Sequence, residues 1–525
     1  MKAKLFILFF TTIVILSGKV KGQINPEWVS TFADSSISLF YTAGIVKDNS
    51  DNVYIASGQG QQGSFLVKYN SSGVEQWTRN IKLGIFDLPR GIVMDSFGNV
   101  YVGGIRENNT GTYDYTVMKF SPTGDSLWAR IYNGLNNFAM DEVEAMTIDD
   151  SNFVYVTGYS HGATLSGDIV TIKYNMNGDS IWIARFNSGG FDRGLDLCVD
   201  NSGNVFVTGF SQFGASAMTV LLKYNASGVF QWSKNPQIPI DQSDKILTAD
   251  NSGNFYLGGY KFFASNDFYL VKYNTNGDTL WSRSHDFSGN DKITAVTLDN
   301  QQNVIATGET YLAGTHTGTV KYTPDGTFLW SKYLQMEGSN TSAIPGDVKC
   351  DANGNVYVGG AGGSFYVVKY SPDGIGMGLG LFSNGISGNN EVSGIVPGTN
   401  DVYIGGRMRL QPTGSAYTSI AMKFNDIPTS ILSNAQVPNG FKLDQNYPNP
   451  FNPSTNISFE LPAKQIITLS VYNSLGHEVV QLINGELTEG KHVYRFDGAG
   501  LSSGVYFYRL KTSSFSETRR MILIK

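Results

Sequence analysis

The stretch NVYVGG, residues 355–360, decides the fold because close variants of it recur along most of the chain. Such runs are apolar at nearly every position, as in Val100, Tyr101 and Val102, which suits a strand that is covered on both faces. The copies lie roughly 50 residues apart, a period that indicates a repeat architecture. They are NVYIASG (52–58), NVYVGG (99–104), FVYVTG (153–158), NVFVTG (204–209), NFYLGG (254–259), NVIATG (303–308), NVYVGG (355–360) and DVYIGG (401–406).

Each copy lies within a longer unit of four short β-type runs. An apolar run that ends in Asp, such as VTLD (296–299), precedes the copy, and a run that ends in Lys-Tyr or Lys-Phe follows it. A glycine turn and a run with tryptophan come next. Turns such as DNSGN (250–254) and NTNGD (274–278) supply the Asn, Asp and Gly that tight hairpins need. A four-stranded unit with this period predicts the blade of a β-propeller.

Tryptophan marks the fourth run and allows the units to be counted. The seventh unit has Gly378 at this position, and in the eighth the position falls beyond Pro428. At the N-terminus, PEWVS (26–30) resembles the tryptophan runs, so Trp28 is assigned to the outer strand of the last blade. The sequence therefore predicts an all-β chain with an eight-bladed propeller over residues 23–427, closed by its N-terminal strand, which hides otherwise exposed edges. The other six tryptophans are Trp77, Trp128, Trp182, Trp232, Trp281 and Trp330.

These seven tryptophans are predicted to be structural. In the spacing Gly-x-x-x-Trp, the glycine turns the hairpin, and the ring on the outermost strand can then pack against the next blade. A binding role is the alternative, but binding sites are seldom repeated identically around a ring.

Three further segments flank the propeller. Lys2 and Lys4 precede an apolar run that ends at Leu16, the layout of a secretory signal peptide over residues 1–22. This run of about 12 residues is too short to span a membrane, and the mature chain is predicted to have no transmembrane segment. Residues 428–443 are interpreted as a linker.

Residues 444–525 are predicted to form a separate β domain. Apolar and polar residues alternate in ISFEL (457–461) and VYFYRL (505–510), which gives strands with one buried face. The prolines of 448–453 deny both helix and sheet pairing, so a rigid extended loop leads into the domain.

Several motifs of this tail occur in a familiar order. They include Asn446, Tyr447, Pro448, Asn449, Pro450 and Phe451, then Gly476, Gly504, Tyr506 and the terminal Lys525. The tail resembles the C-terminal sorting domain of type IX secretion cargo. The resemblance implies that the tail is a small β-sandwich and that the outer-membrane translocon reads it. It also implies that the cargo crosses the periplasm and is secreted or attached to the cell surface.

The repeats carry a second resemblance. Their pattern D-x-x-G-N-V-Y-V-x-G, followed by K-Y-x-x-x-G-x-x-x-W, resembles exported bacterial β-propeller repeats of the SBBP type. The Gly-to-Trp spacing also resembles the tryptophan-docking repeats of quinoprotein dehydrogenases. Both resemblances imply a propeller, and neither fixes a function.

The sequence offers few candidates for chemistry. The spacing of its five histidines matches no metal-binding pattern such as H-x-x-x-H. Nucleophile-elbow, Walker and dinucleotide-binding motifs are also absent from the sequence. The net charge of −6 argues against nucleic acid as a partner. Asp-rich turns such as DNSGN (200–204) present oxygen atoms that could hold Ca²⁺, although hydrogen bonding within the turn explains them as well. No cofactor is predicted, and Ca²⁺ stays open.

One acidic position recurs eight residues before the Asp that ends the first run of a unit. It lies on the loop that leads back to the innermost strand. A ring of such carboxylates at the channel mouth could bind a cation or an amine-bearing ligand, whereas a hydrogen bond that braces each loop would explain the same pattern. The members are Asp87, Asp141, Asp192 and Asp291.

Taken with the predicted export, these features favour a binding or adhesion module for a glycan or a protein. The longest irregular loops include 134–142 and 333–346, and the second, which follows a well-formed blade, is a candidate ligand loop. The alternative is an extracellular propeller enzyme, quinoprotein-like or glycan-degrading.

Overall fold

The computed structural model describes the chain apart from 1–22, 33–40, 59–62, 85–86, 135–139, 163–165, 214–215, 241–244, 263–264, 288, 312–313, 336–341, 387–389, 399–400, 412–415, 426–440, 462–464, 488–489 and 513–514. The expected signal peptide, most of the expected linker and part of the candidate ligand loop 333–346 therefore lie outside the described residues. The chain divides into two compact units, Met1–Ile431 and Leu432–Lys525.

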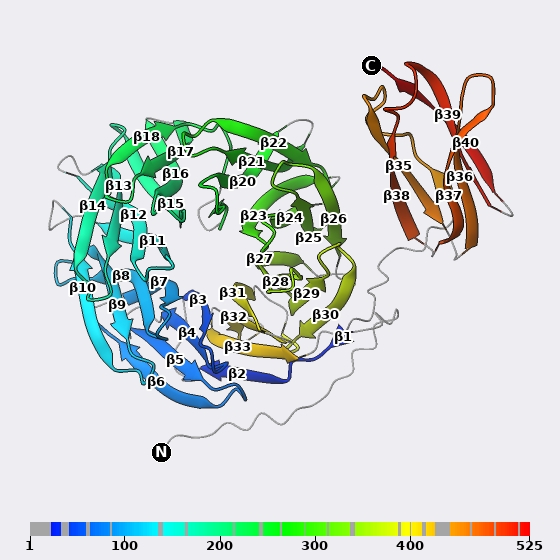
Figure 1. The fold of residues 1–525 in the computed structure, drawn as a ribbon. Coiled ribbons are helices and arrows are strands. Elements are labelled where there is room, and N and C mark those ends of the chain that lie inside the picture. Colours follow the sequence, from blue (N-terminus) through cyan, green and yellow to red (C-terminus); the bar gives the residue numbers. More distant parts are fainter. Residues whose placement is uncertain are drawn as a thin grey trace. The chain divides into compact units, whose positions relative to one another are not determined.

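In the described part of the first unit, eight sheets follow one another along the chain, and Figure 1 shows them as the blades of a ring. Each innermost strand packs against the innermost strand of the next blade, and β31 packs against β3, which joins the last blade to the first. Blade 1 consists of β3 (Tyr41–Lys47), β4 (Val53–Gly58), β5 (Ser64–Tyr69) and β6 (Glu75–Ile81), and blade 2 of β7 (Asp87–Met94), β8 (Val100–Glu107), β9 (Tyr113–Phe120) and β10 (Ser126–Tyr132). Blade 3 consists of β11 (Asp141–Ile148), β12 (Val154–His161), β13 (Gly167–Tyr174) and β14 (Ser180–Phe186), and blade 4 of β15 (Phe191–Val199), β16 (Val205–Phe213), β17 (Ser216–Tyr224) and β18 (Phe230–Lys234). Blade 5 consists of β19 (Leu247–Ala249), β20 (Phe255–Phe262), β21 (Asn266–Tyr273) and β22 (Thr279–His285). Blade 6 consists of β23 (Asn290–Leu298), β24 (Val304–Tyr311), β25 (Thr315–Tyr322) and β26 (Phe328–Leu334). Blade 7 includes β27 (Ala343–Cys350), β28 (Val356–Gly362), β29 (Phe365–Tyr370) and β30 (Gly376–Phe382).

Both ends of the propeller chain build blade 8. Its strands are β31 (Glu391–Pro397), β32 (Asp401–Arg409), β33 (Tyr417–Asn425) and the N-terminal β2 (Trp28–Phe32), with Trp28 opposite Lys423. The predicted all-β fold, a propeller followed by a small β domain, is confirmed. The pairing of β1 (Gln23–Ile24) was not predicted: it lies parallel to β30 as a fifth strand of blade 7.

Each tryptophan joins its blade to the turn between the third and fourth strands of the next blade. The indole N–H donates to a carbonyl of that turn over 2.9–3.3 Å. A glycine of the same turn, with φ between +74° and +86°, lies so close that a Cβ atom would come within 2.5–3.0 Å of the ring. The pairs are Trp28 with Gly73, Trp77 with Gly124, Trp128 with Gly178, Trp182 with Gly228, Trp232 with Gly277, Trp281 with Gly326, and Trp330 with Gly374.

This docking explains why blade 7 lacks a tryptophan. The third and fourth strands of blade 8 come from opposite ends of the chain, so no hairpin turn exists there to receive a ring. Blade 7 has Gly378 opposite Lys369, the register position of tryptophan in the other blades. β1 lies along the adjoining residues Leu379 and Gly380 instead, and Ile24 packs on the core that blades 7 and 8 share.

The lysine of the Lys-Tyr pair has a second role that the sequence did not reveal. In five blades its ammonium group donates to the same carbonyl that accepts the indole N–H, over 2.9–3.1 Å. In four of these five blades the lysine also pairs with the Asp at the end of the first run of its own blade, as in Lys321 and Asp299 at 2.8 Å, both buried. One lysine therefore ties two strands of its own blade to the next blade. The five are Lys68, Lys119, Lys223, Lys272 and Lys321.

Substitution Gly326→Ala tests the docking of the rings. The added methyl group would lie 2.9 Å from Trp281, so the ring must move and the free energy of unfolding is expected to fall by about 1–3 kcal/mol beyond the cost of the positive φ. Gly385→Ala is the matched control, because its φ is +77° and no atom lies within 4 Å of the new Cβ. Denaturant unfolding of both variants gives the difference, and equal losses would contradict the docking.

The second unit is a sandwich of two sheets around one apolar core. One sheet has the order β34 (Lys442–Leu443), β35 (Ser454–Leu461) and β38 (Gly490–Asp497); the other has the order β37 (Glu478–Leu487), β36 (Gln465–Tyr472), β39 (Gly504–Lys511) and β40 (Ser516–Leu523). Alternate residues of these strands, such as Ile457, Phe459 and Leu510, point into the shared core.

Candidate functional site

One face of the propeller carries two kinds of connection, and we call it the loop face. The first kind leads from the outer strand of one blade to the inner strand of the next, and the second joins the middle two strands of a blade. The four acidic residues predicted for the channel mouth lie here, at the first or second position of β7, β11, β15 and β23.

All four of these carboxylates are buried and accept a hydrogen bond from the backbone of their own loop. Burial raises the pKa of Asp87 and Asp141, and it raises the pKa of Asp291 to about 6. Each carboxylate thus braces one loop, as in the second of the two interpretations of the pattern. The Oδ2 acceptors and their donors are Asp87 with Gly84 N (3.2 Å), Asp141 with Gly134 N (2.8 Å), Asp192 with Ser188 N (2.7 Å) and Asp291 with Phe287 N (2.7 Å).

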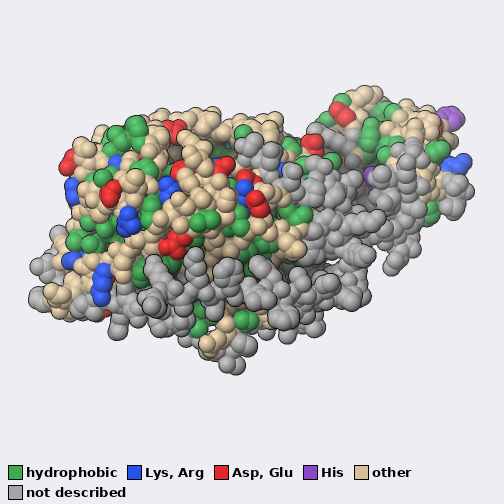
Figure 2. Space-filling view, turned by 90° about the horizontal axis from the view of Figure 1, so that it is seen from below, with side chains coloured by type: hydrophobic (Ala, Val, Ile, Leu, Met, Phe, Trp, Pro, Cys, Tyr) green, Lys and Arg blue, Asp and Glu red, His purple; other side chains and the backbone are tan. Residues whose placement is uncertain are grey.

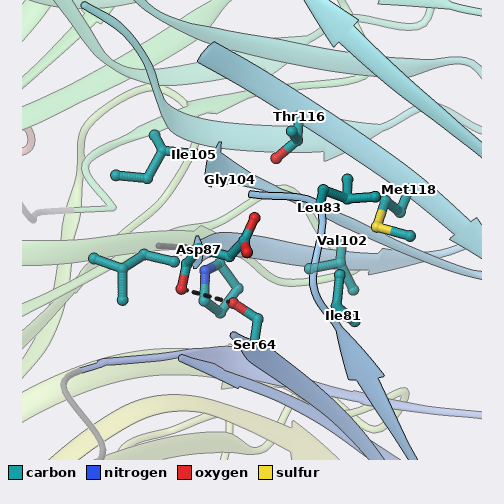
Figure 3. Close-up of a pocket in the computed structure, with 11 residues that line it drawn as sticks. Ser64, Ile81, Leu83, Asp87, Val102, Gly104, Ile105, Thr116 and Met118 are labelled. Carbon is teal, nitrogen blue, oxygen red and sulfur yellow. Dashed lines mark hydrogen bonds between the residues drawn. The ribbon is translucent and has the colours of Figure 1, made fainter. Parts of the chain in front are cut away.

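The surroundings of Asp87 leave little room for a ligand. Figure 3 shows it in a small cavity with apolar side chains such as Ile81, Val102 and Met118, while Ser64 donates to its carbonyl over 3.0 Å. The cavity volume is about 20 Å³, which is space for about one water molecule.

A larger groove lies beside Asp291, between blades 5 and 6. Its volume is about 310 Å³, at the lower end of the range for small-molecule sites. Tyr311 is 58% exposed at its rim, and Lys292 lies 3.7 Å from Glu309 within it. The groove thus combines aromatic faces with amide and charged groups. It is lined by Tyr260, Asn266, Asn290, Asp291, Lys292, Glu309, Tyr311 and Thr315.

The Asp-rich turns lie on the opposite face, and their aspartate oxygens accept hydrogen bonds from N–H groups of the same turn. Asp200 Oδ1 accepts from the backbone N–H groups of Ser202 and Asn204, each at 2.9 Å, and Oδ2 accepts from the Asn204 amide at 2.8 Å. Both oxygens are engaged within the turn, which is the hydrogen-bonded arrangement that competes with a Ca²⁺ site.

In the second unit, the predicted sorting residues surround one irregular loop. The buried Asn446 donates to Pro448 O at 3.1 Å and to Thr455 Oγ1 at 2.9 Å, and Asn449 Oδ1 accepts from Ile522 N at 2.8 Å. The peptide bonds before Pro448 and Pro450 are cis, and Phe451 is buried in the core. By contrast, Tyr447 is 81% exposed.

The remaining sorting residues lie at turns and strand ends. Gly476 has φ +82° in the turn after β36, and Gly504 begins β39. The Tyr506 hydroxyl donates to Ser502 O at 2.8 Å, and the Lys525 ammonium donates to Ala499 O at 2.6 Å.

Comparison with known families identifies this unit. Residues 445–525 match the secretion system C-terminal sorting domain. The tail is a type IX sorting domain. Such a domain marks proteins that type IX secretion exports to the cell surface or the extracellular space, so the predicted recognition and localisation are confirmed. The described residues contain no helix with the length and apolar character needed to cross a bilayer.

One curated protein and two solved structures resemble the chain at low identity. An uncharacterised WD repeat-containing protein, L264, of Acanthamoeba polyphaga mimivirus is 24% identical over 227 residues, which is 38% of this chain and 16% of that protein. Sqt1 from Chaetomium thermophilum has a TM-score of 0.50 at 11% identity and covers 76% of this chain and 99% of its own. PorZ, a surface component of the type IX secretion system of Porphyromonas gingivalis, has a TM-score of 0.35 at 14% identity over 93% of this chain and 75% of its own. The likeness to Sqt1 concerns the fold alone.

Proposed function

We propose that the propeller of this exported chain is a ligand-binding or adhesion module for an extracellular glycan or protein. In this proposal residues 1–22 are removed, residues 23–427 form the propeller, and the linker 428–443 separates it from the sorting domain, which engages the translocon. The groove between blades 5 and 6 carries the proposal.

The lining of the groove suits a polyhydroxylated ligand. Tyr260 and Tyr311 offer aromatic faces together with hydroxyl groups, and such rings hold a ligand with little loss of conformational entropy. Asn290, Lys292 and Glu309 add donors and acceptors that can fix its orientation. The size of the groove favours a glycan unit over a protein, because a stable protein interface needs roughly 800 Å² on each partner.

Figure 2 shows the outer rim of the propeller, seen from below the view of Figure 1. Among its described residues, acidic and basic side chains are interspersed with apolar and polar ones, without the continuous basic stripe that a nucleic acid needs.

Glycan binding by the mature chain tests the proposal. Tyr311→Ala is expected to raise the Kd for a glycan found on an array at least tenfold, because it removes the exposed ring of the groove. Phe97→Ala is the control, since Phe97 is 67% exposed in a turn on the opposite face. A blank array, or equal losses in both variants, would contradict the groove as a glycan site.

Quinone reduction and glycan cleavage should be assayed on the same sample. Turnover together with a blank array would favour the enzyme over the binding module.

A further inference from the structure

Three carboxylates meet on the loop face where blade 5 contacts blade 6. Asp267 lies in β21, Asp286 follows β22, and Asp291 lies in β23. One oxygen atom of each carboxylate lies within 4.8 Å of those of the other two. Two blades thus contribute to one concentration of negative charge.

Asp291 provides a second, independent observation, because one of its two carboxylate oxygens has no hydrogen-bond partner among the described residues. It is 1% exposed, and its Oδ2 accepts the Phe287 N–H. Its other oxygen, Oδ1, is buried without a hydrogen-bond partner among the described residues. A buried carboxylate oxygen is costly unless a donor or a cation satisfies it. Burial, followed by the charges of Asp286 and Asp267, raises the pKa of Asp291 to about 6.

Blades 2 and 3 have the same aspartate as Asp267 but neutralise it with arginine. Asp114 and Asp168 lie, like Asp267, five residues before the lysine of the Lys-Tyr or Lys-Phe pair. Arg106 lies 2.9 Å from Asp114, and Arg185 lies 2.6 Å from Asp168. These arginines supply the positive charge that a buried carboxylate requires.

Asp141 is the counterpart of Asp291 beside blade 2, and the comparison is informative. Its Oδ1 also lacks a hydrogen-bond partner among the described residues. Burial raises the pKa of Asp141, but the positive charge of Arg185 opposes this rise. In blade 5 the residue opposite Asp267 is Lys261, and its ammonium group lies over the Tyr269 ring at 4.8 Å. Here the chain adds the further carboxylate of Asp286 in place of an arginine.

We propose that a calcium ion binds between blades 5 and 6, with Asp267, Asp286 and Asp291 as its protein ligands. Two oxygens bound to Ca²⁺ at about 2.4 Å can lie up to about 4.8 Å apart, and one oxygen of each of the three carboxylates lies within this distance of the others. Ca²⁺ also accepts flexible oxygen coordination, whereas Mg²⁺ demands near-ideal octahedral geometry. Water completes the coordination. The ion joins the two blades beside the groove, a role beyond ligand binding itself.

Calcium titration of the full mature chain, freed of metal with EDTA and then dialysed, tests this site. We expect one site with a Kd of about 0.1–1 mM and a rise in Tm with added CaCl₂. Asp267→Asn and Asp286→Asn are expected to raise the Kd at least tenfold. Asp278→Asn is the matched control, because Asp278 is an exposed aspartate of blade 5, paired with Lys234 in a turn on the opposite face. Its Kd is expected to stay within about twofold of the parent value.

Three outcomes would overturn the site: no response of the parent chain to calcium, an equal effect of Asp278→Asn, or Mg²⁺ binding as tight as Ca²⁺. Tyr311→Ala is expected to keep its affinity for calcium. A failure of the groove as a glycan site would therefore be distinguishable from a failure of the metal site.

Discussion

Deletion of residues 23–32 is expected to destabilise the whole propeller in a single cooperative step. The deletion removes β2, so β33 becomes an open edge, and it removes Trp28, whose ring packs on Gly73 of blade 1 and donates to Ser71 O. Trp28 is half-buried, so the loss of its ring should cost less than the roughly 3–5 kcal/mol of a core tryptophan, and the lost ladder adds to this cost. Thermal unfolding followed by tryptophan fluorescence should show a lower Tm with one transition.

Two comparisons separate the contributions. Trp28→Ala keeps the ladder and removes the ring, so it should lie between the parent chain and the deletion. Deletion of residues 23–24 removes only β1 and should cost less than the deletion of β2, because β1 pairs at just two positions. An unchanged Tm after deletion of 23–32 would contradict closure of the ring by the N-terminal strand.

The sequence predicts the blades well because every blade places its residues in the same surroundings. Val100 and Val356 stand in equivalent strands between the same kinds of neighbour, so one pattern serves for all copies. Trp28 could be found because it repeats the pattern of Trp77 outside its expected place. β1 could not be found, since two residues carry no periodicity. The double role of Lys321 was also hidden, because its second acceptor belongs to another blade.

The candidate site was only partly predictable for the same reason. Asp291 belongs to a recurring position, and the sequence singles it out, but Asp286 belongs to no repeat and its approach to Asp267 depends on how two blades pack. The absence of arginine opposite Asp267 was visible in the sequence as Lys261, where blade 2 has Arg106. Only the structure shows that the neighbouring carboxylates then come together.

Removal of residues 428–525 is expected to abolish export, so that the propeller accumulates in the periplasm of a host with type IX secretion. The sorting domain has its own core and is a separate compact unit, so its removal should leave the propeller folded. Fractionation and immunoblotting measure the share of protein in the medium, at the surface and in the periplasm. Conversely, a reporter fused to residues 428–525 should leave the periplasm. A fusion that stays there would contradict the role of these residues as a sorting signal.

Variants at two neighbouring residues can distinguish recognition of the sorting domain by the translocon from the stability of the domain. Asn446 is buried and holds the loop through Pro448 and Thr455, so Asn446→Ala should lower both the Tm of the domain and its export. Tyr447 is almost fully exposed, so Tyr447→Ala should leave the free energy of unfolding of the domain within about 0.5 kcal/mol of the parent value. If the translocon reads the surface of this loop, Tyr447→Ala will still reduce export severalfold. Normal export of this variant would show instead that the loop acts only through the fold of the domain.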